Sequence, residues 1–379
     1  MNFSINRVAF IKALNVVQRA ISAKTTIPIL TGLKIDVTDH EIMLTGSNAD
    51  ISIQTTISTS NPDNELQIQA TGSLVLSPAR FFAEIVKKLP DRELQVDVAD
   101  QYQTTIKSGN SEFNINGLDA NGYPHLPEID HEHQIELPAK LLREVISQTV
   151  IAVSKQESRP ILTGVHFTLE KHLLAVATDS HRLSQREVEL ESPLTSPADF
   201  VIPGDSLKEL SRMLDDEEDL IKLSLSENQV LFTFGETQFY SRLLEGNYPD
   251  TSRLIPNSSD TKVQFAAGEL LAAVERASLL SHESRNNVIK LTIKPADKQV
   301  MITGNSPDVG KVEENLEPQA LSGNDLEISF NPDYLREALR VFGSVPVEVA
   351  FTSALRPFTI KPLERPDEFI QLITPVRTF

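Results

Sequence analysis

The chain has 379 residues, no cysteine and a formal net charge of −18 at pH 7. This length is too great for one compact core and predicts two to four domains, at about 100 to 200 residues each. The absence of cysteine excludes disulfides, zinc–thiolate sites and thiol nucleophiles. The apolar runs are shorter than the ~20 residues of a membrane span, and the amino-terminal residues lack the pattern of a secretion signal, so we expect a cytoplasmic protein.

One pentapeptide, Pro-Ile-Leu-Thr-Gly, occurs at 28–32 and again at 160–164. Its neighbours repeat in a similar register, which predicts three copies of one domain. A strand-to-loop element recurs at 44–48, 177–181 and 302–306, and Tyr-Pro pairs at Tyr123 and Tyr248 close the first two copies. The third copy lacks the pentapeptide and reads Asn287-Val288-Ile289-Lys290-Leu291 at that place. We therefore expect domains at 1–123, 124–250 and 251–379.

Each copy carries two amphipathic helix patterns, which are predicted at 7–21, 77–89, 138–150, 204–214, 268–281 and 332–342. In the first, the apolar stripe is Phe10, Ile11, Leu14, Val17 and Ile21. The second begins with Ser77 as N-cap and Pro78 at the first helical position. We expect it to bury Phe81, Phe82, Ile85 and Leu89.

The segments between the helices alternate between apolar and polar residues, as strands of a half-buried sheet do. The clearest examples are 33–37, 41–45 and 51–55. The stretches 121–136 and 249–259 lack periodicity and are predicted to be linkers. These patterns favour an α+β protein over one irregular domain with coincidental spacing.

Positive charge is concentrated on the predicted helices. They hold thirteen Lys or Arg against eight Asp or Glu, a net +5, so the rest of the chain carries −23. A uniformly acidic surface repels nucleic acid, but a basic helical surface on an acidic protein can face phosphates while the other surfaces do not.

Catalytic motifs are scarce. Ser180 and His181 are adjacent in an extended segment, so their side chains point to opposite faces and do not form a nucleophile–base pair. His131 and His133 share a face and are a possible metal pair, but a solvated linker is the simpler interpretation without a third ligand. The acidic run 215–219 lacks the spacing of a calcium loop and is predicted to be a solvated turn. The scarcity of motifs favours a binding or topological role without catalysis, metal or cofactor.

Four segments together identify a family. The runs Thr178-Asp179-Ser180-His181-Arg182-Leu183, Gly246-Asn247-Tyr248-Pro249-Asp250 and Ser329-Phe330-Asn331-Pro332-Asp333-Tyr334 and the tail around Pro375 resemble the beta subunit of bacterial DNA polymerase III. The resemblance covers all three copies. It implies three tandem DNA-clamp domains in a head-to-tail homodimeric ring, with helices lining the hole and sheets outside. It also implies a sliding clamp that encircles duplex DNA without reading its sequence and tethers the replicative polymerase for processivity.

The resemblance further implies a hydrophobic groove between the second and third domains, which takes short linear motifs from the polymerase, the clamp loader and repair proteins. Ser180 stands where glycine is common in the family, and Thr374 stands where methionine is common. The groove positions in this chain are Leu162, Thr178, Ser180, His181, Arg182, Leu183, Pro249, Arg253, Leu254, Asn331, Tyr334, Leu355, Pro357, Leu372, Ile373, Thr374, Pro375, Val376 and Arg377.

The resemblance implies the residues of the subunit seam, and together with the helix pattern it implies the residues that face DNA. For the subunit seam, Phe113 and Ile115 are expected to meet Leu279 and Leu280. The family's tyrosine pair near the DNA is replaced by Pro160 and Ile161, so no base stacking is expected there. The residues expected to face DNA are Lys12, Arg19, Lys24, Arg80, Lys87, Lys140, Gln156, Arg159, Lys208, Arg212, Arg336 and Arg340.

Two alternatives remain open at the level of sequence. The first is a triplicated peptide-binding scaffold with no DNA role, because a groove on an acidic protein would serve that purpose too. The second is a hydrolase with a dispersed site around His181. A stable dimer that stays on circular but not on linear DNA would separate the clamp from both.

Overall fold

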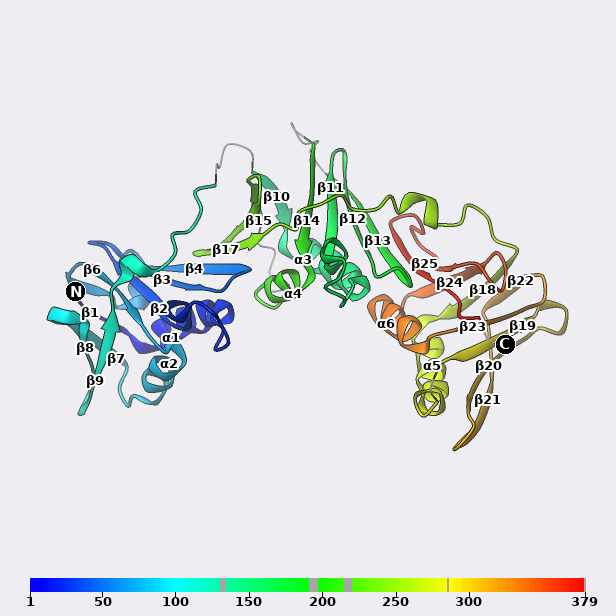
Figure 1. Ribbon diagram of the computed structural model, residues 1–379, viewed down its shortest axis with the longest axis horizontal. Coiled ribbons are helices and arrows are strands. Elements are labelled where there is room, and N and C mark those ends of the chain that lie inside the picture. The colour runs from blue at the N-terminus through cyan, green and yellow to red at the C-terminus, as the bar shows by residue number, and fades with distance from the viewer. Residues whose placement is uncertain (130–133, 191–196, 215–219, 285, 378–379) are drawn as a thin grey trace. The chain divides into compact units, whose positions relative to one another are not determined.

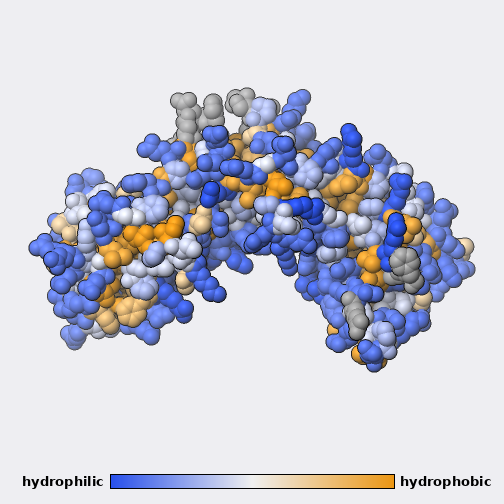
Figure 2. All heavy atoms as spheres, viewed as in Figure 1, coloured by the Kyte–Doolittle hydropathy of each residue, from blue (hydrophilic) through white to orange (hydrophobic). Residues whose placement is uncertain are grey.

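The computed structural model describes residues 1–129, 134–190, 197–214, 220–284 and 286–377. The chain divides into two compact units, unit 1 with residues 1–142 and 209–243, and unit 2 with residues 143–208 and 244–379 (Figure 1). Hydrophilic residues cover most of the visible surface of each unit (Figure 2). The predicted α+β class is confirmed. The domain borders after 123 and 250 stay a prediction.

Unit 1 contains a single antiparallel sheet of 13 strands. Strand β17, from the second copy, pairs with β4 of the first copy and so joins the two copies. In spatial order the strands are β10 (Ile135–Pro138), β15 (Leu220–Leu225), β16 (Gln229–Phe234), β17 (Thr237–Arg242), β4 (Ile51–Ser58), β3 (Glu41–Ser47), β2 (Leu33–Val37), β6 (Gly72–Leu76), β9 (Ser111–Leu118), β8 (Gln103–Ser108), β7 (Glu93–Val98), β1 (Asn2–Asn6) and β5 (Gln67–Ala70).

Unit 2 contains sheets of nine and four strands. In the larger sheet, β26 of the third copy pairs with β13 of the second, and Figure 1 shows the red carboxy-terminal strands beside green β13. The larger sheet is β14 (Ala198–Pro203), β11 (Gly164–Leu169), β12 (His172–Thr178), β13 (Arg182–Glu189), β26 (Phe369–Ile373), β25 (Phe358–Pro362), β24 (Pro346–Phe351), β18 (Thr261–Ala266) and β22 (Ala320–Gly323); the smaller is β21 (Gly310–Leu316), β20 (Gln299–Ser306), β19 (Ile289–Lys294) and β23 (Leu326–Phe330).

All six predicted helices are present, with small differences at their ends. Their bounds are α1 (Arg7–Val17), α2 (Ala79–Lys88), α3 (Ala139–Thr149), α4 (Gly204–Ser211), α5 (Ala267–His282) and α6 (Pro332–Phe342). The prediction that the first helix reaches residue 21 is wrong, because a 3₁₀ turn, Gln18–Ala20, follows α1. Helix α2 begins one residue later than predicted, with Pro78 as its N-cap.

The predicted burial of Phe81 is also wrong, since this side chain is 57% exposed. The predicted burial of Phe82, Ile85 and Leu89 is confirmed, and α2 also buries Val86 and two alanines. The apolar stripe at i, i+3 and i+4 is filled by these residues, and Phe81 falls outside it. The end of the first predicted linker differs as well, because Ile135–Pro138 forms strand β10 and pairs with β15.

The repeated pentapeptide folds in the same way in both copies. Each forms a 3₁₀ turn, Pro28–Thr31 and Pro160–Thr163, followed by a strand. In each turn the threonine hydroxyl donates to the proline carbonyl, at 2.8 and 2.6 Å. A Cβ on Gly32 would lie 2.4 Å from the Val75 side chain, and one on Gly164 would lie 2.6 Å from the Ile202 carbonyl. Close packing therefore requires glycine at the end of the motif.

Candidate functional site

The residues of the predicted groove lie in unit 2, and five of them are in the segment from Thr178 to Leu183. The Asp179 carboxylate accepts the backbone N–H groups of His181 and Arg182, at 2.9 and 3.0 Å. The Thr178 hydroxyl donates to the Arg182 carbonyl at 2.7 Å, and it accepts the Ser180 N–H. Ser180 has a φ of +78°, a left-handed conformation that favours glycine. The loop is therefore held in one conformation by local hydrogen bonds.

Arg182 links this loop to helix α6. Its side chain is only 8% exposed, and its Nε donates to Asp179 at 3.0 Å. The same guanidinium pairs with Glu337 and lies over the Tyr334 ring, 4.7 Å from the ring centroid. The His181 ring is parallel to Tyr334 within 14°, with centroids 6.3 Å apart. Burial and the nearby charge of Asp179 raise the pKa of Tyr334.

Two leucines of the predicted groove lie in an apolar cluster built from two copies. Leu183 of β13 pairs in register with Leu372 of β26. These two leucines and Val176 form a buried cluster, against which Leu174 and Ile255 pack. From the sequence alone, each leucine could be an ordinary residue of a hydrophobic core. The two come together because β13 and β26, which are distant in the chain, pair with each other.

The carboxy-terminal tail borders the same cluster. The Thr374 N–H donates to the His181 carbonyl at 2.9 Å, and the Val376 N–H donates to the Ser329 carbonyl at 2.7 Å. Val376 and Leu254 stay accessible, at 37% and 49% exposure. The predicted pocket around Leu183 therefore has a buried apolar floor and exposed apolar side chains nearby.

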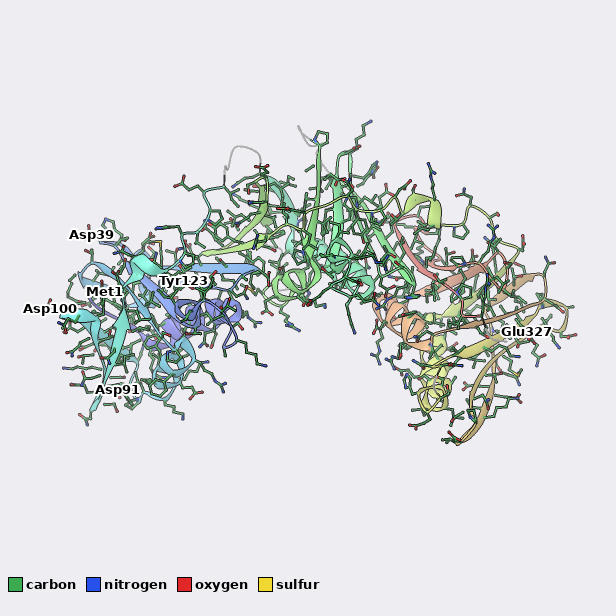
Figure 3. All side chains as sticks on the ribbon, viewed as in Figure 1. Met1, Asp39, Asp91, Asp100, Tyr123 and Glu327 are labelled. Atoms are coloured by element: carbon green, nitrogen blue, oxygen red, sulfur yellow. The ribbon has the colours of Figure 1, made fainter. Side chains whose placement is uncertain are left out.

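The segment after Tyr248 borders the loop as well. The Tyr248 hydroxyl accepts the Thr178 N–H at 3.0 Å, and burial raises the pKa of Tyr248 to about 12. Sequence reasoning missed this role, although the repeated Tyr-Pro pair was the signal. Its counterpart Tyr123, labelled in Figure 3, is 2% exposed, and burial raises its pKa too.

The other predicted groove residues differ widely in how exposed their side chains are. Leu162 is buried, 3% exposed, in the 3₁₀ turn before β11. Leu355 is 64% exposed in the turn between β24 and β25. Arg253 is 89% exposed and pairs with Asp250. Asp179 and Glu337, which the prediction omitted, are the partners that hold Arg182.

Family models match the chain three times in succession. The N-terminal, central and C-terminal domains of the DNA polymerase III beta subunit match residues 1–127, 136–250 and 252–377. The chain belongs to the DNA polymerase III beta subunit family. The resemblance found in the four sequence motifs is thereby confirmed.

Relatives in this family match the chain over its full length. The beta sliding clamps of Bacillus subtilis and Staphylococcus aureus are 48% and 45% identical, with complete coverage of both chains. The crystal structure of the Bacillus subtilis DNA polymerase sliding clamp superimposes with a TM-score of 0.97 at 48% identity, covering 100% of both chains. A Pseudomonas aeruginosa sliding clamp bound to griselimycin has a TM-score of 0.91 at 26% identity, with the same coverage.

The residues predicted to face DNA are mostly on or next to helices. They differ in whether an acidic side chain forms an ion pair with them. Lys12, Lys24, Lys87, Lys140 and Arg159 are exposed, and none makes an ion pair within the described part of the chain. Six others are paired with acids: Arg19, Arg80, Lys208, Arg212, Arg336 and Arg340. Gln156 is exposed in the loop before the second pentapeptide.

Arg336 is the least accessible of these. It is 24% exposed and pairs with Asp333 at 2.7 Å. Burial alone would raise the pKa of Asp333, but hydrogen bonds from His282 and Asn287 and the charge of Arg336 lower it below its usual value. Arg336 is therefore held close to the protein by Asp333, whereas the Arg340 side chain is 57% exposed.

The predicted seam residues are accessible within their own units. Phe113 on β9 is 41% exposed, and Leu279 on α5 is 69% exposed, while Ile115 and Leu280 are half-buried. Within the described residues, 111–116 of β9 pair only with β8, and β21 is the last strand of its sheet. Both units thus present an apolar side chain and an open strand edge.

Other chemistry finds little support. His181 stacks on Tyr334, and no hydrogen bond joins its ring to the Ser180 hydroxyl in the described part of the chain. No three acids or histidines among the described residues form a metal-binding group. The histidine pair at 131 and 133 and the acidic run 215–219 lie outside the described residues. No described helix is long and apolar enough to cross a membrane.

Proposed function

We propose that this chain is a non-catalytic sliding clamp of the cytoplasm. Two copies join head to tail, encircle duplex DNA and tether the replicative polymerase. The observation that carries the proposal is the full-length match to beta subunit domains in tandem, together with 48% identity to a beta sliding clamp. A triplicated scaffold is tolerant of many functions in principle, so the proposal depends on the family and not on the fold alone.

The seam between subunits is proposed to join β9 of one copy to β21 and α5 of the other. Its support is the exposure of Phe113 and Leu279 and the two open strand edges, which would extend one sheet across the seam. Large exposed apolar side chains beside an unpaired edge are uncommon on a monomer.

The proposed DNA contact is electrostatic and independent of sequence. Exposed Lys12, Lys24, Lys87, Lys140 and Arg159 are its strongest candidates, because no acid within the described residues neutralises them. Arg19 and Arg212 share one acid, Glu209, so their pair keeps a net positive charge. Such contacts would hold linear duplex only weakly and would weaken further as salt rises.

The groove around Leu183 and Leu372 is proposed to take short linear motifs of the polymerase, the clamp loader and repair proteins. Its support is the apolar floor, the exposed Leu254 and Val376 and the ordered polar loop at its edge. An extended peptide would place apolar side chains two residues apart on this floor. We also expect griselimycin to bind here, since a family member binds it.

Retention on DNA tests the function directly. A closed ring leaves circular DNA only by opening a seam, so its lifetime there should be nearly independent of moderate salt. Cutting the circle should release it rapidly from the ends. The measurement is the dissociation time of loaded protein before and after linearisation, at two salt concentrations. Equal lifetimes on circular and cut DNA would mean that contacts and not topology hold the protein, and would contradict the clamp.

A further inference from the structure

Strand β26 is buried on both faces, and four of its five residues are apolar. All five residues, Phe369 to Ile373, are at most 5% exposed. Phe369 and Ile373 belong to the core of the third copy, while Leu372 faces the groove cluster. If a strand shifts by one residue against its neighbour, the side chains of its two faces change places. The alternation of apolar and polar residues prevents such a shift only when the two faces differ in polarity. Here they differ at a single residue, Gln371.

Gln371 is buried, and its hydrogen bonds can form only in the observed register of β26 against β13. Its Nε2 donates to the Ser184 hydroxyl at 2.7 Å and to the Gln148 carbonyl at 3.1 Å. The Ser184 hydroxyl, fully buried, donates to the same carbonyl. These groups come from β26, β13 and α3, and Ser184 lies directly opposite Gln371 in the strand pairing. After a slip the amide would face the groove and lose both partners.

The matching joint in unit 1 has the opposite polarity. There Ile53 pairs with Phe239, and Ser52 pairs with Tyr240. Ile53 and Phe239, both fully buried, stand where unit 2 has Ser184 and Gln371. Ser52 stands where unit 2 has Leu183. At the first joint Ile53 and Phe239 face inward, while Ser52 and Tyr240 are on the other face, where Tyr240 packs against Ile129 and Leu231. At the joint in unit 2, Leu183 and Leu372 face the proposed groove, and the polar pair of Ser184 and Gln371 faces inward.

We propose that Gln371 is a positioning residue of the groove. Its two hydrogen bonds hold β26 in the register that turns Leu372 toward the bound peptide. Without them, β26 slips by one residue against β13, its pairing with β25 shifts by the same step, and Leu372 leaves the floor. This proposal rests on the groove of the proposed function, and a buried polar group that selects one register is an established use of such groups.

The test uses Gln371→Met, which keeps the length of the side chain and removes both bonds. We expect griselimycin, and a labelled extended peptide with two leucines two residues apart, to bind at least tenfold more weakly. Unfolding should stay cooperative. The matched control is Gln238→Met on β17, the corresponding edge of the first joint, which should leave both affinities unchanged. Unchanged affinity of Gln371→Met would overturn the proposal.

A second readout reports the register itself, since the chain has no cysteine of its own. Residues Gln185 and Ile370 are opposite each other in the observed pairing. The double variant Gln185→Cys, Ile370→Cys should therefore form a disulfide when Gln371 is unchanged. Gln185→Cys with Phe369→Cys, or Arg186→Cys with Ile370→Cys, should crosslink only after a slip, and hence only with Gln371→Met. Weaker binding with the original crosslink alone would also refute the register role.

Failure of the groove to bind peptide and failure of the register role of Gln371 give different results. If the parent chain binds neither probe, the groove of the proposed function fails, while the crosslinks still decide the register. If Gln371→Met does not fold, Ser184→Ala replaces it, because that change removes one partner and keeps the bond to Gln148. It should give a smaller loss of affinity and a partial slipped crosslink, and the absence of both would count against the proposal.

Discussion

Leu279→Asp is the sharpest perturbation of the proposed seam. Leu279 is 69% exposed in its own unit, so the change should alter the stability of the unit by no more than about 0.5 kcal/mol. At a closed seam, the lost apolar burial amounts to about 2 kcal/mol. The unpaired carboxylate adds about 3 kcal/mol or more. Because a head-to-tail ring has the same seam twice, the dimer should lose about 10 kcal/mol, which is about seven orders of magnitude in the dissociation constant.

Sedimentation of the variant at micromolar concentration should therefore show monomers, while urea unfolding should resemble that of the parent chain. Leu279→Ala should weaken the dimer by the burial contribution alone. Leu363→Asp, at another exposed leucine of unit 2, is the matched control and should leave the dimer intact. An undisturbed dimer for Leu279→Asp would remove Leu279 from the seam, and loss of unit stability would show that it acts within the fold instead.

Three further predictions concern the groove. Deleting 374–379 removes the backbone donors of Thr374 and Val376, so peptide binding measured by fluorescence anisotropy should be lost, while sedimentation should still show a dimer; normal affinity would contradict this. At Ser180, with φ of +78°, a β-branched residue is strained, so Ser180→Val should lower the unfolding free energy in urea by about 1–2 kcal/mol relative to Ser180→Gly, and equal stabilities would refute the strain. The pKa of Tyr248 is raised from 10.0 to about 12, so the stability that the buried neutral phenol contributes is complete below pH 10. It is lost as the pH rises to 12, by about 3 kcal/mol. Tyr248→Phe should therefore lose less stability than the parent chain between pH 9 and 12, and parallel curves would contradict the shift.

Much of the fold was predictable because it depends on local patterns. The six helices followed from apolar residues at helical spacing, and strands such as Ile51–Ser58 followed from alternation. The repeated pentapeptide revealed the copies, since a domain written more than once keeps its turns. Phe81 shows the limit of this reasoning: two adjacent phenylalanines look equally apolar, but only one fits the face that the sheet covers.

The groove could be predicted only through family resemblance, because its parts are distant in the chain. Arg182 meets Glu337 155 residues away, and Gln371 meets Ser184 187 residues away. No local pattern encodes such pairs. The sequence by itself determined the copies, the helices and the concentration of positive charge on them. Only the tertiary structure decided that Leu372 would lie beside Leu183, because the residues of β26 are compatible with either face and the choice depends on partners from two other elements.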